Sequence, residues 1–296
     1  MEDAVEQESG QGPSAQEVGA WYDRLGGLYS LTMGDNMHMG MWEGGRRPDP
    51  GRVLSADEAW QELTAAQDRW TDDLIAELGL APHQRALDIG CGTGRPTVRL
   101  AAASGGHVIG ITASRSQAEQ ATARAEREQP PGKAEFVHGD AMDLPFEDES
   151  FDALWAIESF AHFSDRPRAL RQAWRVLRPG GRLVLADCLE AVPFTEQEAR
   201  LFRGGFALAP LPRSLDDYPA LVRGAGFAIE RVLDRSADFA PTYDLIPLVY
   251  AGRREQLARR LGAEAAGQLD TAYPLILDLC RDKLGYVMVS ARKTAH

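Results

Sequence analysis

The sequence of 296 residues predicts an α/β protein built on a doubly wound, mainly parallel sheet of seven strands. Three observations predict this class. Short β-rich runs alternate with helical patterns from residue 86 to residue 186, which indicates successive βαβ units. Two further β-rich runs follow, at 227–233 and 286–290. A glycine-rich turn stands directly after the first run, at the edge where such sheets bind ligands.

The segments before the sheet differ in character. Residues 1–17 are rich in Glu, Gln and Gly and lack an apolar core, so we expect a disordered tail and no signal peptide. Residues 18–80 predict an N-terminal helical lid. Within the lid, Ser55 and Glu58 fit a capping box. Apolar residues then recur on one helical face, namely Trp60, Leu63, Trp70, Leu74 and Leu78.

Residues 81–190 form the predicted core domain. Its strands are expected at 86–89, 108–111, 135–138, 153–156 and 183–186. Its helices are expected at 97–103, 117–127 and 167–177, where they would cover both faces of the sheet. Residues 191–296 carry the last two strands and two insertions, at 191–225 and 243–279. The insertions are rich in Phe, Tyr and Leu, and we expect them to cover a substrate site.

Composition excludes several classes of partner. The chain has 32 Lys and Arg against 44 Asp and Glu, a net charge of −12, which argues against nucleic-acid or anionic-membrane binding. No run of about 20 apolar residues could span a bilayer. The scattered Cys91, Cys188 and Cys280 suit a reduced cytoplasmic protein, and no Cys/His cluster predicts a metal site. A homo-oligomer stays an open alternative.

The segment 86–96 (ALDIGCGTGRP) predicts a strand, a glycine-rich turn and a helix. The glycines let the backbone approach a ligand, and the helix N-terminus offers unpaired N–H groups. In the dinucleotide fingerprint GxGxxG, counted from Gly90, the third glycine would fall at Arg95. Here it comes one residue earlier, at Gly94, so the pattern is GxGxG preceded by Asp88.

This motif resembles the S-adenosylmethionine loop of class I methyltransferases. Three later segments follow in the family's order, at 139–141, at 143–146 with 150–152, and at 177–181. The resemblance implies a Rossmann-like methyltransferase fold with S-adenosylmethionine as cofactor. It implies that Asp88 holds the methionyl ammonium beside the loop glycines Gly90, Gly92 and Gly94. Asp140, followed by Ala141, would cap the adenine amino group, although a turn-forming Asp is the alternative.

Two segments sharpen the resemblance. Many family members carry an acid for the ribose where this chain has Thr112, so ribose binding would rest on backbone groups or Gln117. The run 110–117 (GITASRSQ), with Thr112 followed by Gln117, is similar to that of sterol, cyclopropane and antibiotic-tailoring methyltransferases, sugar O-methyltransferases among them. Segments 21–23 and 38–42 resemble their helical lid, which implies Tyr22 and Trp42 near the methionine end. Alternatively, these aromatic residues close an N-terminal minicore.

The resemblance implies methyl transfer to a bulky, lipophilic small molecule in bacterial secondary metabolism, with O-methylation of a hydroxyl as the first hypothesis. A neutral hydroxyl needs a base. His162, just past the fourth strand, is the first candidate because histidine titrates near neutral pH. Asp187 is the second, and Glu158 could act in catalysis or hold the cofactor. Each could instead be structural: a packing histidine, a loop cap and a satisfied buried acid.

Three other functions stay open. C-methylation of an isoprenoid chain, even with cyclisation, would use aromatic faces and a carboxylate such as Glu158. N-methylation needs little base when the amine is free. A non-methylating cyclase or binding protein could use the same scaffold, since fold does not determine function.

Overall fold

The computed structural model describes residues 12–294 except 48 and 50. The predicted tail at 1–11 lies outside the described residues. Helix α1 (Ala15–Met33) begins after Ser14, which forms a capping box with Glu17. The tail was expected to reach residue 17, but residues 15–17 already belong to α1. The predicted boundary is therefore too late, because the reciprocal cap starts the lid at Ser14. The lid continues through η1 (Glu43–Gly45) to α2 (Ala56–Leu78), which begins with the predicted cap at Ser55.

The sheet confirms the predicted fold class. Its strands are β1 (Arg85–Ile89), β2 (His107–Thr112), β3 (Lys133–His138), β4 (Phe151–Ile157), β5 (Leu177–Glu190), β6 (Phe227–Asp234) and β7 (Leu284–Lys293). They lie in the order β3-β2-β1-β4-β5-β7-β6, with β7 antiparallel to both neighbours and the other pairs parallel. Strand β5 starts earlier than expected because Leu177 already pairs with Phe151, ahead of a shift in register.

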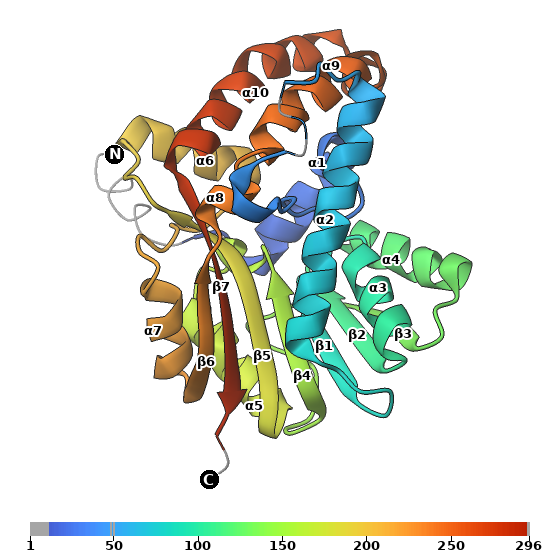
Figure 1. The fold of residues 1–296 in the computed structure, drawn as a ribbon, viewed down its shortest axis with the longest axis vertical. Coiled ribbons are helices and arrows are strands. Elements are labelled where there is room, and N and C mark those ends of the chain that lie inside the picture. The colour runs from blue at the N-terminus through green and yellow to red at the C-terminus, as the bar shows by residue number, and fades with distance from the viewer. Residues whose placement is uncertain (1–11, 48, 50, 295–296) are drawn as a thin grey trace, which may run out of the picture.

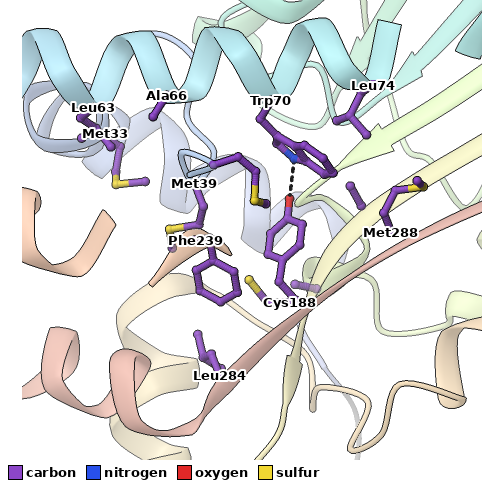
Figure 2. Packing of buried hydrophobic residues seen from close by; sticks show 14 of the residues in the cluster. Met33, Met39, Leu63, Ala66, Trp70, Leu74, Cys188, Phe239, Leu284 and Met288 are labelled. Carbon is purple, nitrogen blue, oxygen red and sulfur yellow. Dashed lines mark hydrogen bonds between the residues drawn. The ribbon is translucent and has the colours of Figure 1, made fainter. Parts of the chain in front are cut away.

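Helices cover both faces of this sheet, as the alternating pattern predicts. They are α3 (Arg95–Ser104), α4 (Arg115–Glu128), α5 (Arg166–Val176) and α7 (Asp217–Gly224). One buried cluster joins the sheet to α2 and α3, and a second joins its other face to α5 and α7. In the first cluster, Trp70 of α2 donates a hydrogen bond of 3.3 Å to the hydroxyl of Tyr286 on β7 (Figure 2).

The cover consists of α6 (Glu196–Phe206), α8 (Ser236–Phe239), α9 (Thr242–Leu261) and α10 (Ala263–Lys283). Helices α9 and α10 together span almost the whole of the second predicted insertion, 243–279. Helix α9 packs against α1, α2 and α10, so the lid and the cover form one helical layer. Most of this layer lies beyond the carboxyl ends of the parallel strands, while the second half of α2 runs down along the sheet (Figure 1). No helix in the described part of the chain is long and apolar enough to cross a membrane.

Candidate active site

The glycine-rich turn between β1 and α3 has the local geometry that its sequence predicts. Gly90 has φ +79°, and a Cβ there would stand 2.3 Å from Cβ of Ser159. Gly94 has φ +81°, and its Cβ would stand 2.7 Å from Cβ of Ala121. Both positions therefore require glycine, for backbone conformation and for space. Gly94 acts in packing α3 against α4.

A cavity of about 880 Å³ opens beside this turn, which we call the strand-end cavity. It brings together most of the predicted site residues, namely Tyr22, Asp88, Gly90, Gly92, Thr112, Gln117, Asp140, Ala141, Glu158 and His162. Among the described residues, Gly94, Trp42 and Asp187 are predicted site residues that do not line it.

Asp88 supplies a buried carboxylate at the end of β1. Its side chain is 3% exposed, and Oδ2 accepts a hydrogen bond of 2.5 Å from the hydroxyl of Thr97. Burial raises the pKa of this carboxyl to about 6. A buried acid in this position favours a cationic ligand, which would restore its ionised form.

The ends of β2 and β3 supply neutral and acidic groups. Thr112 donates a hydrogen bond of 2.8 Å to Oε1 of Gln117. The Gln117 amide nitrogen Nε2 donates a hydrogen bond of 3.7 Å to Sδ of Met37. Asp140 accepts a bond of 2.8 Å from the backbone N–H of Met142. Asp140 thus stabilises a turn and lines the strand-end cavity at the same time.

A second cavity of about 560 Å³ lies under the cover, and we call it the cover cavity. Aromatic, aliphatic and thiol side chains dominate its wall, including Tyr29, Phe202, Phe206, Leu208, Leu211, Cys188 and Cys280. It shares Tyr22, Met37, Glu158 and His162 with the strand-end cavity. These four side chains therefore form the boundary across which two ligands would meet.

His162 lies on this boundary in a defined protonation state. Its Nδ1 is 2.9 Å from the carbonyl oxygen of Ala207, which can only accept, so Nδ1 carries the proton. Its Nε2 therefore accepts a hydrogen bond of 3.0 Å from the hydroxyl of Tyr22. Burial lowers the pKa of His162 to about 4. His162 thus lines both cavities with an unprotonated imidazole.

Glu158 ends β4 in an unusual conformation. Its φ is +49°, which few non-glycine residues adopt and which is common at functional sites. Its Oε1 accepts bonds from the backbone N–H of Met39 at 2.7 Å and from the hydroxyl of Tyr286 at 3.0 Å. Burial raises the pKa of this carboxyl to about 8, so it is largely protonated at neutral pH.

Asp187 lines the cover cavity, but its oxygens are already engaged. Oδ1 accepts a bond of 2.7 Å from the backbone N–H of Cys188, and Oδ2 accepts one of 3.1 Å from Ala161. Burial raises its pKa to about 6. Asp187 therefore stabilises the short helix η2 (Phe160–His162), which carries His162.

The structure places Trp42 differently from the expectation. The side chain is 2% exposed and belongs to the core cluster beside α2. A Cβ on Gly40 would stand 2.9 Å from the Trp42 ring, so the indole packs over that glycine. The physical reason is the turn into η1, where the Trp42 backbone N–H donates to Asp238 of the cover. The alternative of an aromatic minicore describes Trp42 correctly.

Sequence reasoning missed Asn36 and Met37, which both line the strand-end cavity. The available signal was their place next to the segment 38–42 already assigned to the lid. Within the described part of the chain, no group of three or more His, Cys, Asp or Glu could hold a metal ion. The polar set fits S-adenosylmethionine: buried Asp88 suits an ammonium, and Asp140 suits an amino group two strands away.

Comparisons with known proteins agree with this site. Residues 87–185 match a family model described as a methyltransferase domain. The chain is 35% identical to methyltransferase GfsG of Streptomyces halstedii, over 94% of this chain and 95% of that protein. It is 36% identical to 27-O-demethylrifamycin SV methyltransferase of Amycolatopsis mediterranei, over 95% and 98%.

A solved structure extends the comparison to the whole fold. The crystal structure of the [4+2]-cyclase SpnF matches with a TM-score of 0.78 and 30% identity, over 97% of this chain and 100% of that one. The glycine-rich loop, the strand-end cavity and two full-length relatives lead to one conclusion. The chain belongs to the class I S-adenosylmethionine-dependent methyltransferases, among the enzymes that tailor natural products.

Proposed function

We propose that this enzyme O-methylates a hydroxyl group of a bulky, lipophilic natural product, with His162 as the general base. The observation that carries the proposal is the position of His162, on the wall shared by the strand-end and cover cavities. When bound, S-adenosylmethionine supplies an activated methyl group on sulfur. In the strand-end cavity, Asp88, Gly90 and Gly92 would hold its methionyl end, and Thr112, Gln117 and Asp140 its nucleoside.

The chain's own groups then act on the acceptor. The apolar wall of the cover cavity would bind its lipophilic part and exclude water. Its hydroxyl would replace Tyr22 as the hydrogen-bond donor to Nε2 of His162. As the oxygen–methyl bond forms and the sulfur–methyl bond breaks, the hydroxyl proton would pass to Nε2. The Ala207 carbonyl, bonded to Nδ1–H, would stabilise the imidazolium that results.

The carboxylates take supporting roles in this proposal. Asp187 would keep η2 in place through its two backbone bonds rather than accept the proton. Glu158 joins β4, the lid at Met39 and β7 at Tyr286, so it would shape the boundary between the cavities. Both remain candidates for a direct catalytic role in the alternatives below.

The test is methyl transfer from ¹³C-methyl-labelled S-adenosylmethionine to a panel of lipophilic macrolide and polyphenol alcohols. We expect a product that is heavier by one labelled methyl group, with the ¹³C shift of a methoxy carbon. A label on carbon would instead support C-methylation, and a label on nitrogen N-methylation. The cover cavity disfavours an isoprenoid diphosphate, because none of the described residues that line it is Arg or Lys.

Cyclisation without methyl transfer is the second candidate, since the chain is 30% identical to a [4+2]-cyclase over nearly its whole length. It predicts a product of unchanged mass and no consumption of the cofactor.

We also infer a cytoplasmic location, because Cys91, Cys188 and Cys280 are all unpaired and buried. A homo-oligomer stays an open alternative, which light scattering would test.

A further inference from the structure

Asn36 holds a buried amide oxygen without a partner. The side chain is 5% exposed and lies in the wall of the strand-end cavity. Its Nδ2 donates hydrogen bonds to Oδ1 of Asp68 at 3.0 Å and to Oε1 of Gln67 at 3.5 Å. Its Oδ1 accepts none from any described residue. A buried polar atom without a partner is costly and calls for an explanation.

The surrounding bonds permit only this orientation of the amide. Gln67 uses Nε2 to donate to the carbonyl oxygens of Met33 and His38, at 2.7 and 2.6 Å, so it turns its oxygen towards Asn36. The other partner, Asp68, offers only acceptors. If the Asn36 amide were reversed, its oxygen would face these two oxygens. The unpaired oxygen is therefore a consequence of the network.

Arg95 holds this network in place. It donates to Asp68 twice, from Nη2 to Oδ2 at 2.7 Å and from Nε to Oδ1 at 3.2 Å, which makes a bidentate pair. Arg95 occupies the position where a dinucleotide fingerprint would have its third glycine. The side chain at this position thus turns away from the ligand and acts through Asp68.

The place of Asn36 indicates which donor it lacks. Thr93 of the glycine-rich loop donates to the carbonyl oxygen of the adjacent Asp35 at 3.0 Å. Asp88 is bound by Thr97 in the first turn of α3, the turn that Arg95 begins. Asn36 and Asp88 are thus both attached to the start of α3, whereas Asp140 follows β3. Asn36 therefore lies at the Asp88 end of the strand-end cavity.

We propose that Asn36 is a further cofactor-binding residue, whose Oδ1 accepts a hydrogen bond from the methionyl ammonium of S-adenosylmethionine, and that Asp68 and Arg95 are positioning residues for this bond. An ammonium offers three donors, so one can reach Asp88 and another Asn36. Because Oδ1 is shielded from water, contact needs a side-chain adjustment of the kind that often accompanies binding. The proposal depends on the cofactor alone and is independent of the acceptor.

Isothermal titration with two ligands tests the role of Asn36. The ligands are S-adenosylhomocysteine and its deamino analogue, which keeps the carboxylate and lacks the ammonium. For Asn36→Leu we expect affinity for S-adenosylhomocysteine to fall at least about tenfold, and affinity for the analogue to change less than about twofold. An equal loss for both ligands, or unchanged affinity for S-adenosylhomocysteine, would overturn the proposal.

Two neighbouring aspartates of α2 provide a matched test of the positioning role. Asp68→Asn lets the Asn36 amide reverse, and we expect a loss of about threefold or more that is confined to the ligand with an ammonium. Asp72→Asn removes a similar ion pair with α3, to Arg99 at 2.6 Å, and should leave both affinities unchanged. If the two variants behave alike, Asp68 does not position Asn36. If the wild type binds neither ligand, the cofactor assignment itself fails.

Discussion

Glu158 and His162 lie four residues apart on the same boundary, yet burial acts on them in opposite directions. Both lose water, so the uncharged form is favoured in each. For the carboxyl this means a raised pKa, and for the imidazole a lowered one. At neutral pH the boundary thus carries a protonated carboxyl at Glu158, which can donate a hydrogen bond, and a neutral imidazole at His162, which can accept a proton.

The pH dependence of stability tests the state of Glu158. Because its pKa in the folded protein is about 8, above the ordinary 4.5, the protonated carboxyl stabilises the fold at low pH. This stabilisation is lost as pH rises from about 4.5 towards 8. Glu158→Gln keeps a neutral acceptor and removes the titration. In urea unfolding at pH 5 and pH 8.5, we expect the wild type to lose on the order of a few kcal/mol more than the variant.

Asp88 and Asp187 titrate in the same direction and are present in both proteins, so the difference between the proteins reports Glu158 together with its charge coupling to Asp187. Parallel losses of stability in the two proteins would contradict a raised pKa at Glu158.

His162→Ala tests the proposed base. We expect kcat for a hydroxyl acceptor to fall at least about 10²-fold, since the hydroxyl proton loses its acceptor. In the wild type, a pKa near 4 leaves His162 unprotonated above pH 5, so its titration should not slow the reaction between pH 5.5 and 7. Stopped assays with labelled methyl donor measure both effects. An unchanged rate in His162→Ala would point to an amine acceptor or another base.

At the scale of elements, the contact between α3 and α4 depends on a glycine. Gly94 caps α3 with φ +81°, and the ring of Phe136 on β3 stands as close to its would-be Cβ as Ala121 does. Any side chain there would push α3 away from its neighbours. The helix start that faces the ligand would move with it.

Alanine substitutions at two glycines measure this requirement. We expect Gly94→Ala to lower the free energy of unfolding by roughly 1–3 kcal/mol, from backbone strain and overlap. Gly204→Ala is the control, because Gly204 lies inside α6 with no heavy atom near its would-be Cβ. It should stabilise the protein by about 0.5–1 kcal/mol, since alanine favours a helix. Equal effects in urea unfolding would show that the conformation at Gly94 is not required.

At the scale of the whole molecule, ligand binding should appear as stability. A ligand at about 100 times its Kd adds about 2.7 kcal/mol to the folded state. We expect S-adenosylhomocysteine to raise the melting temperature of the wild type, and NAD to leave it unchanged. Asp88→Ala should abolish the shift, because the ammonium loses its carboxylate. A full shift in Asp88→Ala would mean that the glycine-rich loop binds its ligand differently.

Much of the molecule is predictable from local sequence. The alternation of elements, the cap at Ser55 and the glycine-rich turn depend on residues close together in the chain, so their patterns are visible without a structure. These patterns also predict the strand-end side chains Asp88, Thr112 and Asp140, since parallel strands end at one edge.

Other features depend on distant segments and leave no such pattern. The proton on His162 Nδ1 is determined by Ala207, 45 residues later. Asn36 is held by Asp68 of α2, which Arg95 of α3 holds in turn. The sequence prediction for Trp42 is wrong for the same reason, because its backbone partner Asp238 belongs to the cover. Long-range pairing, rather than local propensity, decides which side chains reach the site.

The boundary shared by the two cavities also has a consequence for product release. Tyr22 of α1 and Met37, in the turn after it, line both the strand-end and the cover cavities. A movement of this segment would therefore change the walls of both cavities at once. With the cofactor and the acceptor bound in these two cavities as proposed, the release of both products would depend on this segment, and the rate of its movement would set an upper limit on turnover.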